Sequence, residues 1–158
     1  MIVSDGEPPR SIDSAVVPGS SSALVWTTGV PTAPLPDPTP SVKSLIPRPG
    51  GTTAIVVRFP PDSVYADPGF DPESAAAEQL VMSPGLAELF EAEDPAMHTT
   101  PTVDYAVVMD GEIVLDLDGD STVVRQGDVV VQNGTRHAWR NPGPTPVTVF
   151  FVLLGTGT

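Results

Sequence analysis

The chain contains two histidines, and their surroundings suggest where chemistry could occur. His98 lies in the segment MHTTPTVDY and His137 lies in GTRHAWRN, each where a short strand pattern begins and close to a turn residue. Asp104 follows His98 in the same segment. Two imidazoles and one carboxylate can bind a divalent metal such as Fe(II), Mn or Zn with open positions. Without a metal, the same groups can form a general base that a carboxylate orients.

The alternation of side chains along a strand predicts which residues share a face with the histidines. His98, Thr100 and Asp104 are all even-numbered, so an extended path directs them to one side. By the same rule His137 and Trp139 share a face. If the two strands are neighbours, both imidazoles and the carboxylate converge beside an indole. We then expect Thr100 and Trp139 to line the substrate-binding part of the site.

Three nearby side chains are expected to point away from this site. Tyr105 is odd-numbered and should pack on the other face of its strand. Arg136 and Arg140 have the opposite parity to His137, which places them outside a closed β-structure.

The segment from residue 97 onward has the pattern of short β-strands that must position these residues. Apolar and acidic residues partly alternate in EIVLDLD, and the strands are separated at short intervals by turn signals: Asp110-Gly111, Asp118-Gly119, Gln126-Gly127, Asn133-Gly134 and Asn141-Pro142-Gly143. Strands this short with turns this close predict a sandwich or a small barrel.

Residues 62–96 are predicted to be helical. Asp71 is a suitable N-cap, Pro72 suits the first helical position, and the helix should end near Ser83. A second short helix is expected after it, with one apolar face formed by Leu86, Leu89 and Phe90. Two placements stay open for this segment, a lid over the site and packing against the outside of a sheet.

Residues 1–51 are rich in Pro, Ser and Gly and are predicted to form an extended N-terminal arm. Strand patterns occur at Ala23–Gly29 and, just beyond the arm, at Thr52–Pro61. The prolines of Val30–Pro40 exclude a helix or a central strand there. The arm could pair with the sheet edge of a neighbouring subunit or wrap its own domain.

Composition excludes several classes of function. A chain of 158 residues predicts a single domain, and its net charge of -13 makes nucleic acid an unexpected partner because such affinity depends on neutralising phosphates. There is no cysteine, and no apolar run approaches the roughly 20 residues needed to span a bilayer. The N-terminus lacks the pattern of a secretion signal, so a cytoplasmic location is expected.

Two spaced motifs run through the β segment. In the first, Asp104 follows His98, and Gly111 follows Asp104 after six residues. The second contains, in order, Gly127, Gly134, His137 and Asn141. These motifs resemble the two signatures of the cupins, which read HxH with a later Glu and Gly, and Gly with a later Gly and HxxxN. The similarity is to small single-domain cupins of the cupin 2 conserved-barrel type.

This resemblance implies an all-β fold, the double-stranded β-helix or cupin jelly-roll barrel. It implies one cupin domain over residues 1–158, with an N-terminal arm at 1–51, a short helical insertion at 62–96, and core barrel strands at 97–156 carrying both motifs. Small cupins of this kind are commonly homodimers, and the arm offers a physical route to one.

The resemblance also implies a site. The family site normally has three histidines and a glutamate, whereas here Thr100 occupies the second histidine position and Asp104 the glutamate position. His98, Asp104 and His137 are therefore the predicted catalytic residues. They are also the predicted ligands if one divalent metal (Fe, Zn or Mn) is bound. A site without a metal stays open.

Three functions are compatible with these residues. The first is a small-molecule enzyme of lyase or isomerase type, such as a decarboxylase, dehydratase or cyclase, acting on a natural-product-like or carboxylic-acid substrate inside the barrel. The second is a metal-dependent dioxygenase with a site of two histidines and one carboxylate. The third is a non-catalytic cupin that binds a small ligand. The expected partner in each is a small molecule, with neither nucleic acid nor membrane involved.

Overall fold

The computed structural model describes residues 8, 10–29 and 37–157. The strands in this part of the chain are β1 (Arg10–Asp13), β2 (Ser21–Thr28), β3 (Thr52–Phe59), β4 (Thr102–Val108), β5 (Glu112–Leu117), β6 (Asp120–Arg125), β7 (Val129–Asn133), β8 (His137–Arg140) and β9 (Val147–Gly155). Between them lie the helix α1 (Pro72–Met82) and the short 3-10 helices η1 (Thr39–Ser41), η2 (Asp62–Val64) and η3 (Ala87–Leu89).

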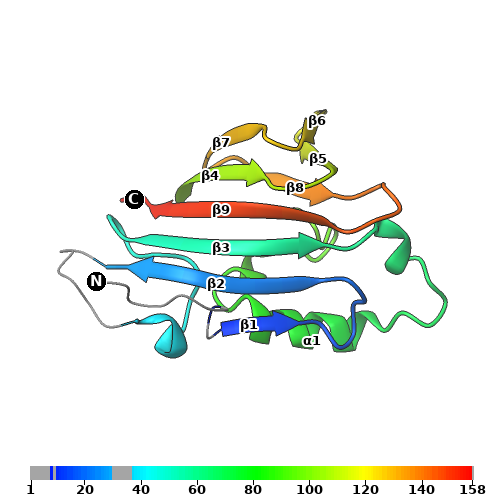
Figure 1. Cartoon of the computed structure of the whole chain (residues 1–158), viewed down its shortest axis with the longest axis horizontal. Coiled ribbons are helices and arrows are strands. Elements are labelled where there is room, and N and C mark those ends of the chain that lie inside the picture. The colour runs from blue at the N-terminus through cyan, green and yellow to red at the C-terminus, as the bar shows by residue number, and fades with distance from the viewer. Residues whose placement is uncertain (1–7, 9, 30–36, 158) are drawn as a thin grey trace.

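The strands form two antiparallel sheets, which confirms the predicted all-β fold. The larger sheet has the order β1-β2-β3-β9-β4-β7, and the smaller has the order β6-β5-β8. In Figure 1 the red β9 runs between β3 and β4, and β5 and β6 of the small sheet lie at the upper right. The C-terminal strand thus joins the N-terminal part of the large sheet to the strands that carry the predicted site.

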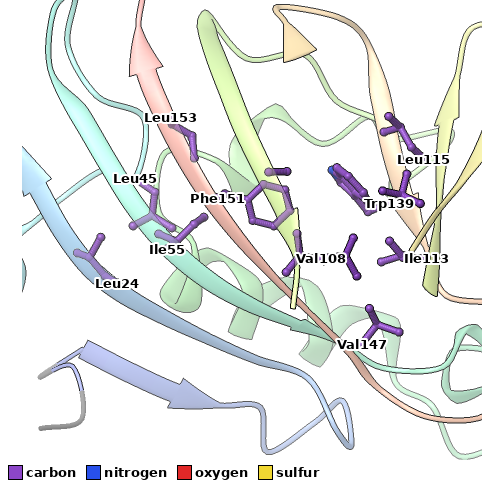
Figure 2. Close-up of a cluster of buried hydrophobic side chains, with 13 residues drawn as sticks. Leu24, Leu45, Ile55, Val108, Ile113, Leu115, Trp139, Val147, Phe151 and Leu153 are labelled. Carbon is purple, nitrogen blue, oxygen red and sulfur yellow. The ribbon is translucent and has the colours of Figure 1, made fainter. Parts of the chain in front are cut away.

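The core lies between the two sheets because each strand directs alternate apolar side chains inward. On β9 the buried positions are Val147, Val149, Phe151 and Leu153, while the residues between them are only partly buried. Figure 2 shows Phe151 of the large sheet and Trp139 of the small sheet meeting in this core. Burial of each large apolar side chain contributes roughly 2 kcal/mol toward holding the sheets together.

Part of the predicted N-terminal arm belongs to the large sheet. The strand patterns expected at Ala23–Gly29 and Thr52–Pro61 correspond to β2 and β3, which pair with each other, and β1 pairs with β2 in turn. These contacts lie within one chain. Residues 30–36 of the proline-rich run Val30–Pro40 lie outside the described residues. The homodimer stays a prediction.

The helix expected after Asp71 is confirmed. The Asp71 carboxylate accepts hydrogen bonds from the backbone amides of Glu73 and Ser74 at 3.1 and 3.2 Å, and Pro72 opens the helix. Glu78 of α1 accepts hydrogen bonds from the amides of Ala15 and Val16, so the helix packs beside the β1–β2 connection (Figure 1). No helix in the described ranges is long and apolar enough to cross a membrane.

The second predicted helix is wrong. Only the single turn η3 forms, and Phe90 directly after it is extended with φ -66° and ψ 137°. The reason is tertiary: Phe90 makes an isolated antiparallel bridge with His98, which takes its backbone away from the helix. Leu86, Leu89 and Phe90 therefore do not share a helical face.

Candidate functional site

The two histidines are paired through their backbones. The amide of His98 donates to the carbonyl of His137 at 3.0 Å, and the amide of His137 donates to the carbonyl of His98 at 3.0 Å. This bridge adds the segment around His98 to the edge of β8, and Phe90 pairs with His98 on its other side. The sequence-based expectation that the two histidine segments are neighbours is thus confirmed.

The two imidazole rings are in contact and are oriented in the same manner. Their centroids lie 4.3 Å apart at an interplanar angle of 50°. The Nδ1 atom of His98 contacts the carbonyl of Ala96 at 3.2 Å, and Nδ1 of His137 contacts the carbonyl of Thr135 at 2.8 Å. A carbonyl can only accept, so Nδ1 carries the proton in both rings and each Nε2 keeps its lone pair.

Burial keeps both imidazoles neutral at pH 7. His98 is 8% exposed and His137 is 3% exposed. Desolvation lowers the pKa of His98, and desolvation together with repulsion from His98 lowers the pKa of His137 to about 4. The Phe90 and His98 rings meet at an interplanar angle of 71° with centroids 4.8 Å apart, which contributes to this apolar covering. The pair can therefore act as a base, and two positive charges cannot coexist on it.

A row of polar side chains leads from the histidines into the large sheet. Thr100 lies two residues beyond His98, roughly 7 Å along an extended chain, and its hydroxyl donates to Asp104 Oδ2 in a long hydrogen bond of 3.5 Å. Thr102 donates to the Thr100 hydroxyl at 2.7 Å. All three are buried, as the parity of Thr100 and Asp104 predicted. Burial raises the pKa of Asp104, whose other oxygen, Oδ1, has no partner among the described residues.

Sequence reasoning missed Gln132. This residue ends the valine run of β7 and pairs directly with Asp104 across the β4–β7 ladder. It is 4% exposed, and neither its Oε1 nor its Nε2 has a partner within the described part of the chain. A signal existed, because a lone glutamine at the end of VVVQ, inside the motif that leads to His137, interrupts an apolar strand.

The predicted metal-ligand set is not assembled. No three His, Asp or Glu side chains in the described ranges are grouped so that they could hold a metal ion. The two imidazoles belong to the β8 edge of the small sheet, whereas Asp104 lies on β4 in the large sheet and is turned toward Thr100. The two imidazoles supply two nitrogen donors, and no His, Asp or Glu side chain of the described residues joins them as a third ligand. The mechanism proposed below therefore uses these side chains alone.

The other motif residues in and directly after β8 are buried and have structural contacts. Trp139 lies in the core against Phe59 and Phe151, with ring centroids 6.4 and 5.5 Å away. Asn141 is buried and holds the following turn through its side chain, donating to the carbonyls of Phe59 and Thr145. A half-open hollow of about 220 Å³, lined in part by Val64, contains none of the predicted site residues.

The outward-facing arginines fasten the segment before His98. Arg136 makes two hydrogen bonds of 2.7 Å to the Glu91 carboxylate and also pairs with Asp118. Arg140 pairs with Asp94 and with Asp116, each at 2.9 Å. Glu91 and Asp94 belong to the loop that enters the His98 bridge, so these ion pairs fix that loop to the small sheet. Their position outside the barrel confirms the parity prediction, as does Tyr105, which is 45% exposed.

Two antiparallel sheets enclose an apolar core, and both imidazoles and several polar side chains are buried with it. Residues 85–153 match the family model of the cupin domain. The matched segment is less than half of the chain and contains both motifs, so this part of the chain is similar to the cupin domain, as the motifs predicted.

Relatives with partial matches come from fungi. The chain is 56% identical over 50 residues to phomopsin biosynthesis cluster protein C' of Diaporthe leptostromiformis, covering 31% of this chain and 26% of that protein. It is 36% identical over 93 residues to the cupin-domain-containing oxidoreductase srdD of Neurospora crassa, covering 56% of this chain and 44% of that protein. The matched segments thus span less than half the length of these relatives.

A solved structure with a similar arrangement is the Cupin_2 domain of an XRE family transcriptional regulator from Enterobacter cloacae. It is 12% identical, with a TM-score of 0.46, and the match covers 88% of this chain and 99% of that domain.

Proposed function

We propose that the protein is a small-molecule enzyme of secondary metabolism in which His98 and His137 carry out acid–base chemistry of the lyase or isomerase type. The observation that carries the proposal is the pair of neutral imidazoles, 4.3 Å apart, each with Nδ1 held by a backbone carbonyl. The biosynthesis-cluster names of partial relatives support a role in secondary metabolism.

The pair is suited to moving one proton at a time. One Nε2 takes a proton from a carbon next to a substrate carbonyl, and the electron pair of the broken C–H bond moves toward the carbonyl oxygen. The adjacent imidazole stays neutral because a second positive charge at this distance is unfavourable. The same proton then returns to a different carbon in an isomerisation or to a leaving hydroxyl in a dehydration. Both routes balance without an oxidant.

The surroundings favour a substrate with an apolar body. Trp139 and Phe151 form the aromatic part of the core next to His137 on β8, and Phe90 covers His98. Aromatic walls bind apolar ligands, while a few polar groups fix their orientation. Thr100 and Asp104 supply such polar groups.

An oxidoreductase is the second candidate. Three partial relatives carry the name cupin-domain-containing oxidoreductase, which favours a reaction that transfers electrons. In this chain the histidines would then move the proton that accompanies the oxidation, and an electron acceptor such as oxygen would be consumed.

Deuterium incorporation tests the proposed chemistry before the natural substrate is known. In D2O, 2′-hydroxyacetophenone, which carries its hydroxyl on the ring, exchanges the methyl protons next to its carbonyl, and 1H NMR follows their loss. We expect the wild-type protein to accelerate this exchange, and His137→Gln and His98→Gln each to lower the acceleration at least about tenfold. Tyr105→Phe, on the outer face of β4, is the control and should exchange as the wild type does.

Two further measurements separate the candidates. Absence of any acceleration by the wild type would contradict the acid–base proposal. Oxygen uptake with a candidate substrate, together with stoichiometric iron in protein purified without a histidine tag, would instead support the oxidoreductase.

A further inference from the structure

Asp104 and Gln132 form a polar pair on the inner face of the large sheet. They stand opposite each other in the β4–β7 ladder and are 6% and 4% exposed. The next inward-facing pair along the same strands, Ala106 and Val130, is apolar and packs with the core. The Asp104–Gln132 pair therefore marks where the interior changes from apolar to polar.

Three atoms of this pair have no hydrogen-bond partner among the described residues: Asp104 Oδ1, Gln132 Oε1 and Gln132 Nε2. An unpaired buried polar atom destabilises a fold by roughly 1–3 kcal/mol, so such atoms are normally satisfied. The pair thus offers one amide donor and nearby acceptors to a bound group.

The charge of the interior restricts what that group can be. All seven Lys and Arg residues of the chain lie in the described ranges, and none is buried. A carboxylate or phosphate at the Asp104–Gln132 pair would have no counter-charge beside it, and burying an unpaired charge is strongly unfavourable. A neutral oxygen-containing group satisfies the same atoms without this penalty.

We propose that Gln132 and Asp104 form a substrate subsite that binds a neighbouring hydroxyl and carbonyl of a neutral molecule, with Gln132 as a specificity-determining residue. Gln132 Nε2 donates to the carbonyl oxygen, while Gln132 Oε1 or Asp104 Oδ1 accepts from the hydroxyl. Thr100 hydrogen-bonds to Asp104 and lies two residues after His98 in the chain, so the proposal places the bound group on the side of the sheet that leads to the imidazole pair. This proposal rests on the acid–base function proposed above and specifies its substrate class. The expected substrates are neutral hydroxycarbonyl compounds instead of carboxylic acids.

Binding of three matched probes tests the subsite. The probes are 2′-hydroxyacetophenone, acetophenone without the hydroxyl, and 2-hydroxybenzoate with a carboxylate in place of the ketone. Titration calorimetry should show that the wild type prefers 2′-hydroxyacetophenone by about tenfold or more over the other two. Gln132→Leu, of similar volume, should abolish this preference. Gln126→Leu, an exposed glutamine whose amide donates to the Met109 carbonyl, should retain it.

A stability measurement distinguishes a binding residue from a structural one. Because leucine removes two unpaired buried atoms, Gln132→Leu should unfold at the same or a higher temperature than the wild type. Three outcomes would overturn the proposal: Gln132→Leu keeps the preference, the wild type binds 2-hydroxybenzoate equally well, or the wild type binds none of the probes.

The subsite and the acid–base function can fail separately. His137→Gln should keep the binding preference while it loses deuterium exchange. If the wild type shows the preference without exchange, the subsite stands and the acid–base function falls. If exchange occurs but Gln132→Leu keeps the preference, the acid–base function stands and the subsite falls.

Discussion

His98 and His137 exchange backbone hydrogen bonds of 3.0 Å in both directions, and this places their rings in contact although they are far apart in the sequence. The bridge joins the loop that precedes β4 to the beginning of β8. Each Nδ1 is also held by the backbone carbonyl two residues earlier, so hydrogen bonds to the backbone orient both rings. Neighbouring side chains such as Phe90 then shield the rings from solvent.

The buried His137 makes stability depend on pH. Its pKa is about 4 in the folded protein, against about 6.5 in an unfolded chain, so the unfolded state binds the proton first as pH falls. Above pH 6.5 the neutral His137 does not lower the free energy of unfolding. As pH falls from 6.5 to 4, protonation of the unfolded state lowers this free energy by about 3 kcal/mol. Urea denaturation across this range should show the loss in the wild type, and His137→Gln should show a distinctly smaller slope. Equal slopes would contradict the burial of a neutral imidazole.

Asp104→Asn should stabilise the protein at neutral and higher pH. Burial raises the pKa of Asp104 in the folded state. The contribution of Asp104 to the free energy of unfolding is therefore fully present below its pKa in the unfolded chain, and it is lost as pH rises through its pKa in the folded protein. Asparagine has the same shape and carries no charge. The melting temperature of the variant, relative to wild type, should therefore rise more at pH 8 than at pH 4.5. A difference that shrinks with increasing pH would argue against a desolvated carboxyl.

Asn141→Ala should weaken the fold by roughly 2–3 kcal/mol. Asn141 is 1% exposed, its amide donates to the carbonyls of Phe59 and Thr145, and its Oδ1 accepts from Gly143. Removal of the side chain leaves these backbone groups unpaired. Urea denaturation should report the loss, and Asn133→Ala, on an exposed asparagine of β7, is the matched control. We expect the probe preference to persist in folded Asn141→Ala, because Asn141 supports a turn.

Arg140→Gln should loosen the loop before His98 with little effect on global stability. Its ion pairs with Asp94 and Asp116 are about a third exposed, and such pairs contribute about 1 kcal/mol or less. The local effect should be larger, since the loop from Glu91 to Met97 depends on this contact. Hydrogen exchange should be faster at the amides of Glu91 and His98. Arg125→Gln, which breaks the exposed pair with Glu112, should leave these amides unchanged.

Local patterns were sufficient to predict several parts of the fold. The helix after Asp71 was predictable because capping depends on a few adjacent residues, and the outward positions of Tyr105, Arg136 and Arg140 followed from strand alternation. The second helix was wrongly predicted because Phe90 fits a helical pattern but pairs as a β-bridge with His98, eight residues further along the chain. Tertiary pairing overrode the periodicity there.

The sequence by itself determined which side chains share a face along each strand and that two histidine motifs of cupin spacing are present. Only the tertiary structure decided which strands are neighbours and in which register. That register places His98 against His137, whereas Asp104 lies on β4 of the larger sheet, hydrogen-bonded to Thr100 and opposite Gln132. The physical reason is that alternation is a property of one backbone segment, whereas pairing depends on hydrogen bonds between segments and on the apolar core that both sheets must share.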